Sequence, residues 1–219
     1  MKENLTELVF ILDMSGSMYD LTADTVGGFN AMLEKQKREE GEALVSLVVF
    51  NEDSTVLLDR VPLDKAEPLT EDQYCPCGST ALLDAMGSAI RHIGNVHKYI
   101  REEDRPARTL FVITTDGKEN ASRSYSADKV RSLVRNHSRK DGWEFLFLGA
   151  NIDAVETARH YGIRSDRAVE FLNDEQGVEL NYRIVAKTIS KIRVCPAGAE
   201  SLDASWKDEI EADRKKRTR

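Results

Sequence analysis

The stretch that decides the fold is Leu8-Val9-Phe10-Ile11-Leu12-Asp13-Met14-Ser15-Gly16-Ser17-Met18. Its five leading apolar residues predict a strand that is buried on both faces, as in a parallel sheet. The run stops at Asp13, Ser15 and Ser17, so a carboxylate and two hydroxyls lie on one tight loop at the end of the strand. Open α/β sheets carry their ligand sites in crevices of this kind. Such oxygens suit a hard cation such as Mg²⁺ or Mn²⁺ rather than zinc, although a Ser-Gly turn capped by Asp is also common after strands.

Two later stretches also place an oxygen-bearing side chain at the boundary of a predicted strand or helix. Gly78-Ser79-Thr80 leads into a helix with apolar periodicity, so Thr80 lies at a helix N-terminus, where an ordinary N-cap is the alternative role. Leu110 to Thr115 is a second buried-strand run, and it ends on Asp116-Gly117, where a simple turn is the alternative. Each stretch alone is weak evidence. The ordered set of three loops predicts that their oxygens converge on one site.

With these three loops in this order, the chain resembles the von Willebrand factor A domain family, which includes the integrin I domains. The resemblance covers about residues 5 to 194. It implies an intact metal-ion-dependent adhesion site that holds Mg²⁺ or Mn²⁺. Carried over by position, the implied ligands are Asp13, Ser15 and Ser17 from the first loop, Thr80 from the second and Asp116 from the third, and none of the five departs from the family pattern.

The rest of the chain alternates strands and helices. Strands expected at residues 43–50, 110–115, 143–149 and 168–172 are separated by helical segments. This order predicts an α/β fold with a doubly wound, mostly parallel, Rossmann-like sheet and helices on both faces. Residues 54–58 follow the strand before them too closely for a helical crossover, so they are expected to return as one antiparallel edge strand.

Two helices carry further expectations. The helix at residues 21–37 contains Gly27 and Gly28, which are poor helix formers and are expected to let the backbone approach the sheet closely. The helix at residues 174–193 has a narrow apolar stripe, followed by Pro196 and a charged segment, so its far end is expected to be weakly anchored. In integrin-like relatives the metal shell is coupled to the C-terminal helix, and a similar switch is possible here.

Composition predicts one domain over residues 1–194, followed by a charged tail at 195–219. The 219 residues are 41% hydrophobic and 32% charged, which fits a globular domain. Trp206 and Ile210, four residues apart, are suited to pin a short helix in the tail onto the domain. The basic end, from Arg214 onward, is either solvated or a contact arm for a partner or nucleic acid.

Charge and hydropathy narrow the partners and the location. The net charge of −7 and the pI near 5.3 argue against a general nucleic-acid binder. There is no signal-like apolar region, and no apolar stretch approaches the roughly 20 residues that span a membrane. A cytoplasmic protein with no membrane contact is therefore expected.

The three cysteines leave their role open. Cys75-Pro76-Cys77 has C-x-C spacing rather than C-x-x-C, and could be a redox pair or half of a metal site. Cys195 and the four histidines do not complete a zinc-like spacing with it.

The ligand set itself indicates a function. Mg²⁺ takes six oxygens, and here only two of the five expected ligands are charged. A water-filled position would then face outward, and an Asp or Glu carboxylate of a protein partner could replace that water. The resemblance implies this role, and the chain is therefore expected to be a metal-dependent protein–protein interaction module rather than an enzyme.

Two alternatives stay open. A metal-dependent phosphoester hydrolase would need a base, and Glu119 is the nearest candidate, with Lys118 as a phosphate contact. The position two after Asp13 is Ser15, whereas haloacid-type phosphatases need a second Asp there, and the glycine-rich phosphate loops are absent. The second alternative is a nucleic-acid-associated protein that uses the basic tail.

Overall fold

The computed structural model describes residues 1–195 and 202–218. Its sheet has six strands in the order β3-β2-β1-β4-β5-β6. They span Lys2–Asp13 (β1), Glu42–Phe50 (β2), Ser54–Pro62 (β3), Pro106–Thr115 (β4), Glu144–Ala150 (β5) and Ala168–Phe171 (β6). Only β3, at one edge, runs antiparallel to its neighbour. The predicted doubly wound sheet with one antiparallel edge strand is confirmed.

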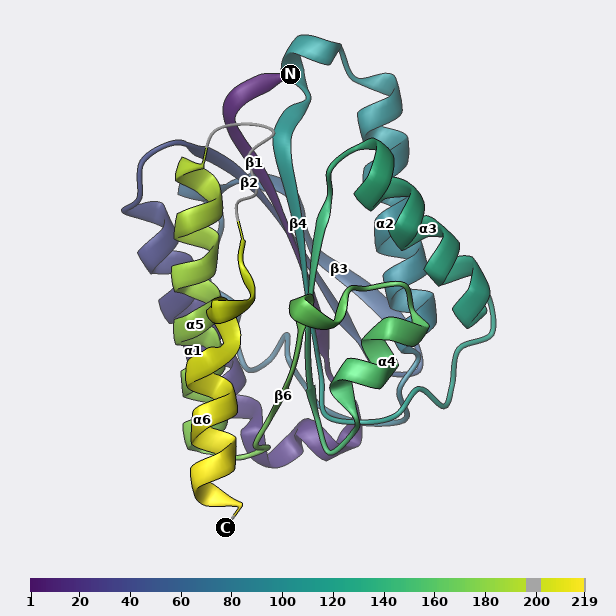
Figure 1. The fold of residues 1–219 in the computed structure, drawn as a ribbon, viewed down its shortest axis with the longest axis vertical. Helices are drawn as coiled ribbons and strands as arrows, with labels where there is room; N and C mark the ends of the chain where they lie inside the picture. Colours follow the sequence, from purple (N-terminus) through teal and green to yellow (C-terminus); the bar gives the residue numbers. More distant parts are fainter. Residues whose placement is uncertain (196–201, 219) are drawn as a thin grey trace.

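Helices cover both faces of the sheet (Figure 1). One face carries α1 (Thr22–Lys37), α5 (Glu175–Val194) and α6 (Asp208–Arg217), and the other carries α2 (Leu82–Tyr99), α3 (Ala127–Lys140) and α4 (Ala154–His160). Alternate residues of β1 enter the two cores: Leu8 and Phe10 face α1 and α5, while Val9 and Ile11 face α2. This two-residue period, with a core on each face, is why the run from Leu8 to Leu12 in β1 is apolar at every position.

The final segment packs against the domain. Trp206 and Ile210 are buried in the same core as α1 and α5, and α6 begins between them at Asp208. The short helix that their spacing indicated is therefore present. Among the described residues, no helix combines the length and the apolar composition that crossing a membrane requires.

The expectation that α5 is weakly anchored is wrong. The helix lies between α1 and α6, and its buried residues recur from Gly177 to Arg193. At its far end Arg193 donates to the carbonyl oxygens of Gln36 at 2.6 Å and Gly41 at 2.7 Å. Helix α6 belongs to the segment 195–219, which was expected to be a tail outside the domain, and it covers apolar surface of α5. Whether α5 can switch stays a prediction.

The two glycines of α1 differ in their surroundings. A Cβ at Gly28 would lie 2.3 Å from a ring carbon of Tyr182 on α5, whereas a Cβ at Gly27 would meet no atom within 4 Å. The close approach that was expected against the sheet is therefore a helix–helix contact, and only Gly28 makes it. Because Gly28 has no Cβ, the aromatic ring of Tyr182 can pack directly against the backbone of α1.

Gly28→Ala should destabilise the fold, because the new methyl group would have to displace a ring that is packed in the core. Overpacking of this kind costs about 1–3 kcal/mol. Gly27→Ala is the matched control, since the same change at an exposed helical position should be neutral or stabilise by up to about 1 kcal/mol. Urea unfolding of both variants measures the two values, and equal effects would show that the contact with Tyr182 does not matter.

Candidate metal centre

The first loop follows β1, and the third follows its neighbour β4. Parallel pairing of the two strands puts Leu12 opposite Thr114, so Asp13 and Thr115 come out at the same edge of the sheet. The Thr115 hydroxyl donates to Asp13 Oδ2 at 2.5 Å, and the backbone N–H of Ser15 donates to Asp13 Oδ1 at 2.8 Å. Tyr74 donates its hydroxyl to the backbone carbonyl of Asp13. Each carboxylate oxygen of Asp13 is thus held in a fixed direction.

Hydroxyl contacts continue from the first loop to the third. Ser15 Oγ and Ser17 Oγ lie 3.2 Å apart, and the Ser17 hydroxyl donates to Asp116 Oδ1 at 2.6 Å. The other oxygen of Asp116 accepts a hydrogen bond of 3.1 Å from the side-chain amide of Asn173, which follows β6. The structure therefore brings Asp13, Ser15, Ser17 and Asp116 together in one connected group.

The second loop is attached to both of the others. The N–H of Gly16 donates to the carbonyl of Gly78, and the N–H of Cys77 donates to the carbonyl of Met14. On the other side, Asn120 accepts the N–H of Thr80 and donates its own N–H to the carbonyl of Thr80. Gly78 has φ of +73°, a conformation that glycine adopts without strain.

Thr80 is not the N-cap of α2. The helix begins at Leu82, and the residue before it, Ala81, makes no side-chain cap. The Thr80 side chain is buried, and its hydroxyl makes no hydrogen bond within residues 1–195 and 202–218. A Cβ at Gly117 would lie 3.5 Å from this hydroxyl, so Thr80 Oγ1 lies beside the third loop. The ordinary capping role is therefore excluded, and the hydroxyl is available to a ligand.

The charge in this site is uncompensated. Asp13 is 1% exposed and Asp116 is 2% exposed, and neither has an ion pair with a basic side chain in the described part of the chain. Burial raises the pKa of Asp13 above its ordinary value; hydrogen bonds from Ser15 and Thr115 oppose that effect, while the nearby charge of Asp116 adds to it. Two buried carboxylates without a counter-charge are costly unless a cation lies between them.

Glu119 has a structural role. Its Oε1 accepts the N–H groups of Ala121 and Ser122, and its Oε2 accepts the N–H of Leu83 and the hydroxyl of Ser122. It thereby ties the third loop to the first turn of α2. Four hydrogen bonds occupy the carboxylate that the hydrolase alternative would use as a base.

Two of the three cysteines, Cys75 and Cys77, lie next to the second loop, and all three are free thiols. Cys75 and Cys77 are exposed, and Cys77 Sγ accepts a hydrogen bond from the Asn51 side chain. Among the described residues, no group of three His, Cys, Asp or Glu side chains could hold a metal ion. The five expected ligands include three hydroxyls, so they lie outside that class of site.

Sequence reasoning missed three supporting residues. Asn173 could have been found by the rule that identified Asp13 and Asp116, because it also follows a parallel strand at the carboxyl edge. Thr115 is a polar residue inside an otherwise apolar run, which is a weak signal. Tyr74 lies in an irregular segment, and no pattern in the sequence indicated its contact with the first loop.

Solved structures share this architecture. A von Willebrand factor type A protein from Catenulispora acidiphila superposes with a TM-score of 0.59 at 16% identity, over 87% of this chain and 43% of that chain. The chain has a von Willebrand factor A-like fold. The pilus adhesin SpaC from Lactobacillus rhamnosus GG, in its open conformation, matches with a TM-score of 0.61 at 13% identity, over 87% of this chain and 30% of that chain.

A third solved structure with this architecture contains a metal. It is proximal thread matrix protein 1 from the mussel byssus, with a zinc-occupied MIDAS motif, and it matches with a TM-score of 0.58 at 15% identity, over 86% of this chain and 46% of that chain. This chain spans less than half the length of each of the three solved chains. No family model matches the sequence, and no curated protein matches it either.

Asp13→Asn should stabilise the metal-free von Willebrand factor A-like fold at neutral pH. Burial raises the pKa of Asp13 above the ordinary value of 3.8, so the folded state loses stability as the pH rises from that value through the folded-state pKa. The amide removes this loss. We expect a higher melting temperature than wild type at pH 7 in chelator, and a difference that shrinks as the pH falls toward 3.8.

The control is Asp20→Asn, which changes an exposed carboxylate on the helical turn after the first loop. It should melt like wild type at both pH values. An Asp13→Asn variant that melts below wild type at pH 7 would contradict the view that the Asp13 charge is uncompensated.

Proposed function

We propose that this chain is a metal-dependent protein-interaction module. In this proposal Asp13, Ser15, Ser17, Thr80 and Asp116 hold Mg²⁺ or Mn²⁺, and the cation captures an Asp or Glu carboxylate of a partner. The single observation that carries it is the pair of buried carboxylates without a basic partner among the described residues. A divalent cation would neutralise both.

The surroundings of the five oxygens support the same proposal. Mg²⁺ prefers hard oxygen ligands and takes six of them, so five protein ligands leave room for a water or a partner oxygen. Ser17 is exposed, and Tyr19, on the same turn, is 71% exposed. The site therefore opens to solvent on the side of the first loop, where a partner could reach the cation and rest on an aromatic ring.

Binding is favoured over the two alternatives. Glu119 is committed to four hydrogen bonds that hold the loops together, so it is a poor candidate for the base that hydrolysis requires. Two arginines of the basic tail are paired within the chain: Arg214 pairs with Glu170 at 2.6 Å, and Arg217 with Asp174 at 2.7 Å. A contact arm for nucleic acid would have fewer free charges than the sequence alone indicated. The cytoplasmic location stays a prediction.

Calorimetry with Mg²⁺ and Mn²⁺ should detect one site in the wild-type protein and none in Asp13→Ala. The variant should stay folded, because the change removes a repulsive charge together with a ligand. Glu52→Ala is the matched control, since Glu52 is an exposed carboxylate next to Gly78 of the second loop and is not an expected ligand. Equal affinity of wild type and Asp13→Ala for both ions would contradict the assignment of Asp13 as a metal ligand.

Thr80→Ala should weaken metal-dependent carboxylate capture much more than it weakens folding. The hydroxyl caps no helix and makes no hydrogen bond in the described structure, so the loss of stability should be under about 1 kcal/mol. The measurement is an NMR titration with glutarate, in saturating Mg²⁺ and again in chelator. If Thr80→Ala binds glutarate like wild type in Mg²⁺, Thr80 is not a ligand, whatever the first and third loops do.

A further inference from the structure

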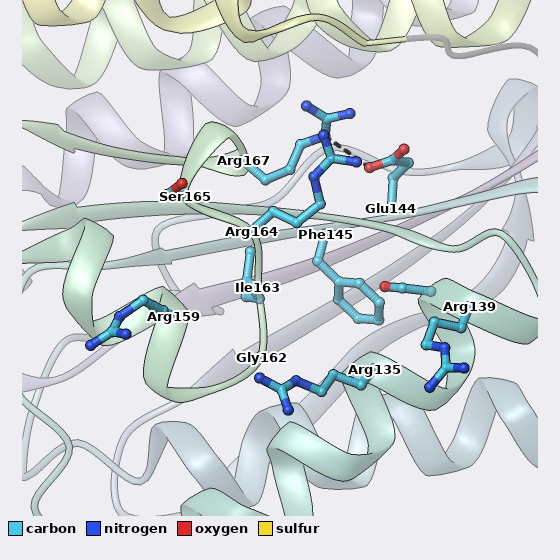
Figure 2. A pocket seen from close by; sticks show the side chains of 11 residues that line it. Arg135, Arg139, Glu144, Phe145, Arg159, Gly162, Ile163, Arg164, Ser165 and Arg167 are labelled. Atoms are coloured by element: carbon cyan, nitrogen blue, oxygen red, sulfur yellow. Dashed lines mark hydrogen bonds and ion pairs between the residues drawn. The ribbon is translucent and has the colours of Figure 1, made fainter.

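A second charged site lies near the amino ends of the strands, opposite the candidate metal centre. It is a cavity of about 550 Å³ between the C-terminal half of α3, the start of β5 and the segment 162–167 that leads into β6 (Figure 2). Glu144 begins β5 and lines this cavity, whereas Asp13 and Asp116 follow the carboxyl ends of their strands. The cavity is therefore distinct from the candidate metal centre.

Arginine dominates the lining of this cavity. The five arginines are Arg135, Arg139, Arg159, Arg164 and Arg167, and the only acidic lining residue is Glu144. Figure 2 shows Arg135 and Arg139 on α3, with Arg159 and Arg164 on the segments that face it. Phe145 and Ile163 lie between them and are almost fully buried, so they form an apolar floor. On the wall that faces α3, Arg164 pairs with Asp166 at 2.7 Å and Arg159 with Glu156 at 2.6 Å. The charge without an acidic partner among the described residues is therefore that of Arg135 and Arg139 on α3.

One of these arginines is structural. Arg167 is 2% exposed and donates to Glu144 at 2.9 Å, to Asp166 at 2.6 Å and to the carbonyl of Leu202 at 2.7 Å. It anchors the segment before β6 to β5 and to the chain after the undescribed residues. Its charge is compensated, so it is not counted as part of a ligand site.

Arg159 is held only loosely. It pairs with Glu156 on the same helix at 2.6 Å, but the two side chains are 70% and 59% exposed. Exposed pairs of this kind contribute little to stability, because water screens both charges. Arg159 can therefore turn toward an anion in the cavity at small cost.

Arg135 and Arg139 are the unusual pair. They are four residues apart on α3, so they lie next to each other on its surface, where like charges repel. Neither makes an ion pair or a side-chain hydrogen bond within the described residues. Arg139, in the last turn, complements the helix dipole, but Arg135 lies a turn earlier. The repulsion has no structural compensation here.

The rest of α3 adds to this field. The helix carries five basic residues, Lys129, Arg131, Arg135, Arg139 and Lys140, against the single acid Asp128. The whole chain has a net charge of −7. A basic helix on an acidic protein concentrates the positive potential around this cavity and steers anions toward it.

We propose that this cavity binds a small molecule that carries two or more phosphate groups. Every cationic residue in the lining is arginine, whose planar guanidinium matches phosphate oxygens with two parallel hydrogen bonds. The volume is within the range of small-ligand sites, about 300–1,000 Å³. Two neighbouring arginines on α3, with the exposed Arg159 on the facing wall, suit a ligand with more than one anionic group. This proposal does not depend on the function proposed for the metal centre.

Calorimetry in EDTA tests the site, because the chelator prevents a cation in the metal centre from bridging to phosphate. The probes are inorganic pyrophosphate, ADP and AMP. Pyrophosphate and ADP should bind, AMP at least tenfold more weakly, and the affinity should fall as salt rises. ADP that binds more tightly than pyrophosphate would assign the site to a nucleotide, and equal affinity would assign it to the phosphates alone; both support the proposal.

The decisive variant is Arg135→Gln combined with Arg139→Gln. Both side chains are exposed, so the variant should melt like wild type, and it should bind ADP and pyrophosphate at least tenfold more weakly. The matched control is Arg38→Gln combined with Arg91→Gln, which removes the same charge from two exposed arginines elsewhere and should leave both affinities unchanged.

Three outcomes would overturn the proposal. The first is the absence of binding by any of the three probes at millimolar concentration. The second is equal affinity of the wild type and the Arg135/Arg139 variant. The third is a single-stranded RNA oligonucleotide that binds more tightly than ADP and requires the same two arginines, which would make the cavity part of a nucleic-acid surface.

Discussion

Two carboxylates, those of Asp13 and Asp116, are buried at the carboxyl ends of the strands with no basic side chain paired to them in the described chain. Glu7, fully buried on β1, shows the contrast, because its carboxylate accepts hydrogen bonds from Arg60 and His97. Asp13 and Asp116 have no such partners, although leaving an ion buried and unpaired costs on the order of several kcal/mol. A fold tolerates such a local violation where function requires it, and the carboxyl edge of a parallel sheet is where ligands bind.

The three loops are built to hold these charges in place. Backbone hydrogen bonds join the first loop to the second through Gly16 and Gly78, and the second to the third through Thr80 and Asn120. Glu119 then fixes the third loop to α2. A site that exchanges one oxygen ligand for another needs its remaining oxygens to stay within about 0.5 Å of their positions, and loops joined in a closed ring achieve this better than side chains on independent loops.

The sequence predicted the elements and the first contacts of the site because both follow from short-range patterns. An apolar run that ends in Asp is visible within a few residues, and the alternation of strands with helices predicts a mostly parallel sheet. It did not predict contacts between distant segments. The ring of Tyr182 against Gly28, the amide of Asn173 on Asp116 and the cover of α6 over α5 depend on tertiary packing that no local periodicity encodes. Glu119 was visible as a charged loop residue, but its four hydrogen bonds come from groups that only the fold brings around it.

The two proposed sites lie at opposite ends of the strands and carry opposite charge. Asp13 and Asp116 lie at the carboxyl ends of the strands, and Arg135 and Arg139 lie near the amino ends, all four without an ion pair among the described residues. The strands therefore separate the two proposed sites. This separation has a physical consequence for each site. A phosphate group bound near Asp13 and Asp116 would add repulsion to a centre that already lacks positive charge, and a cation would be repelled by Arg135 and Arg139. In the two proposals the cation and the phosphate ligand lie at opposite ends of the strands, so neither would weaken the binding of the other.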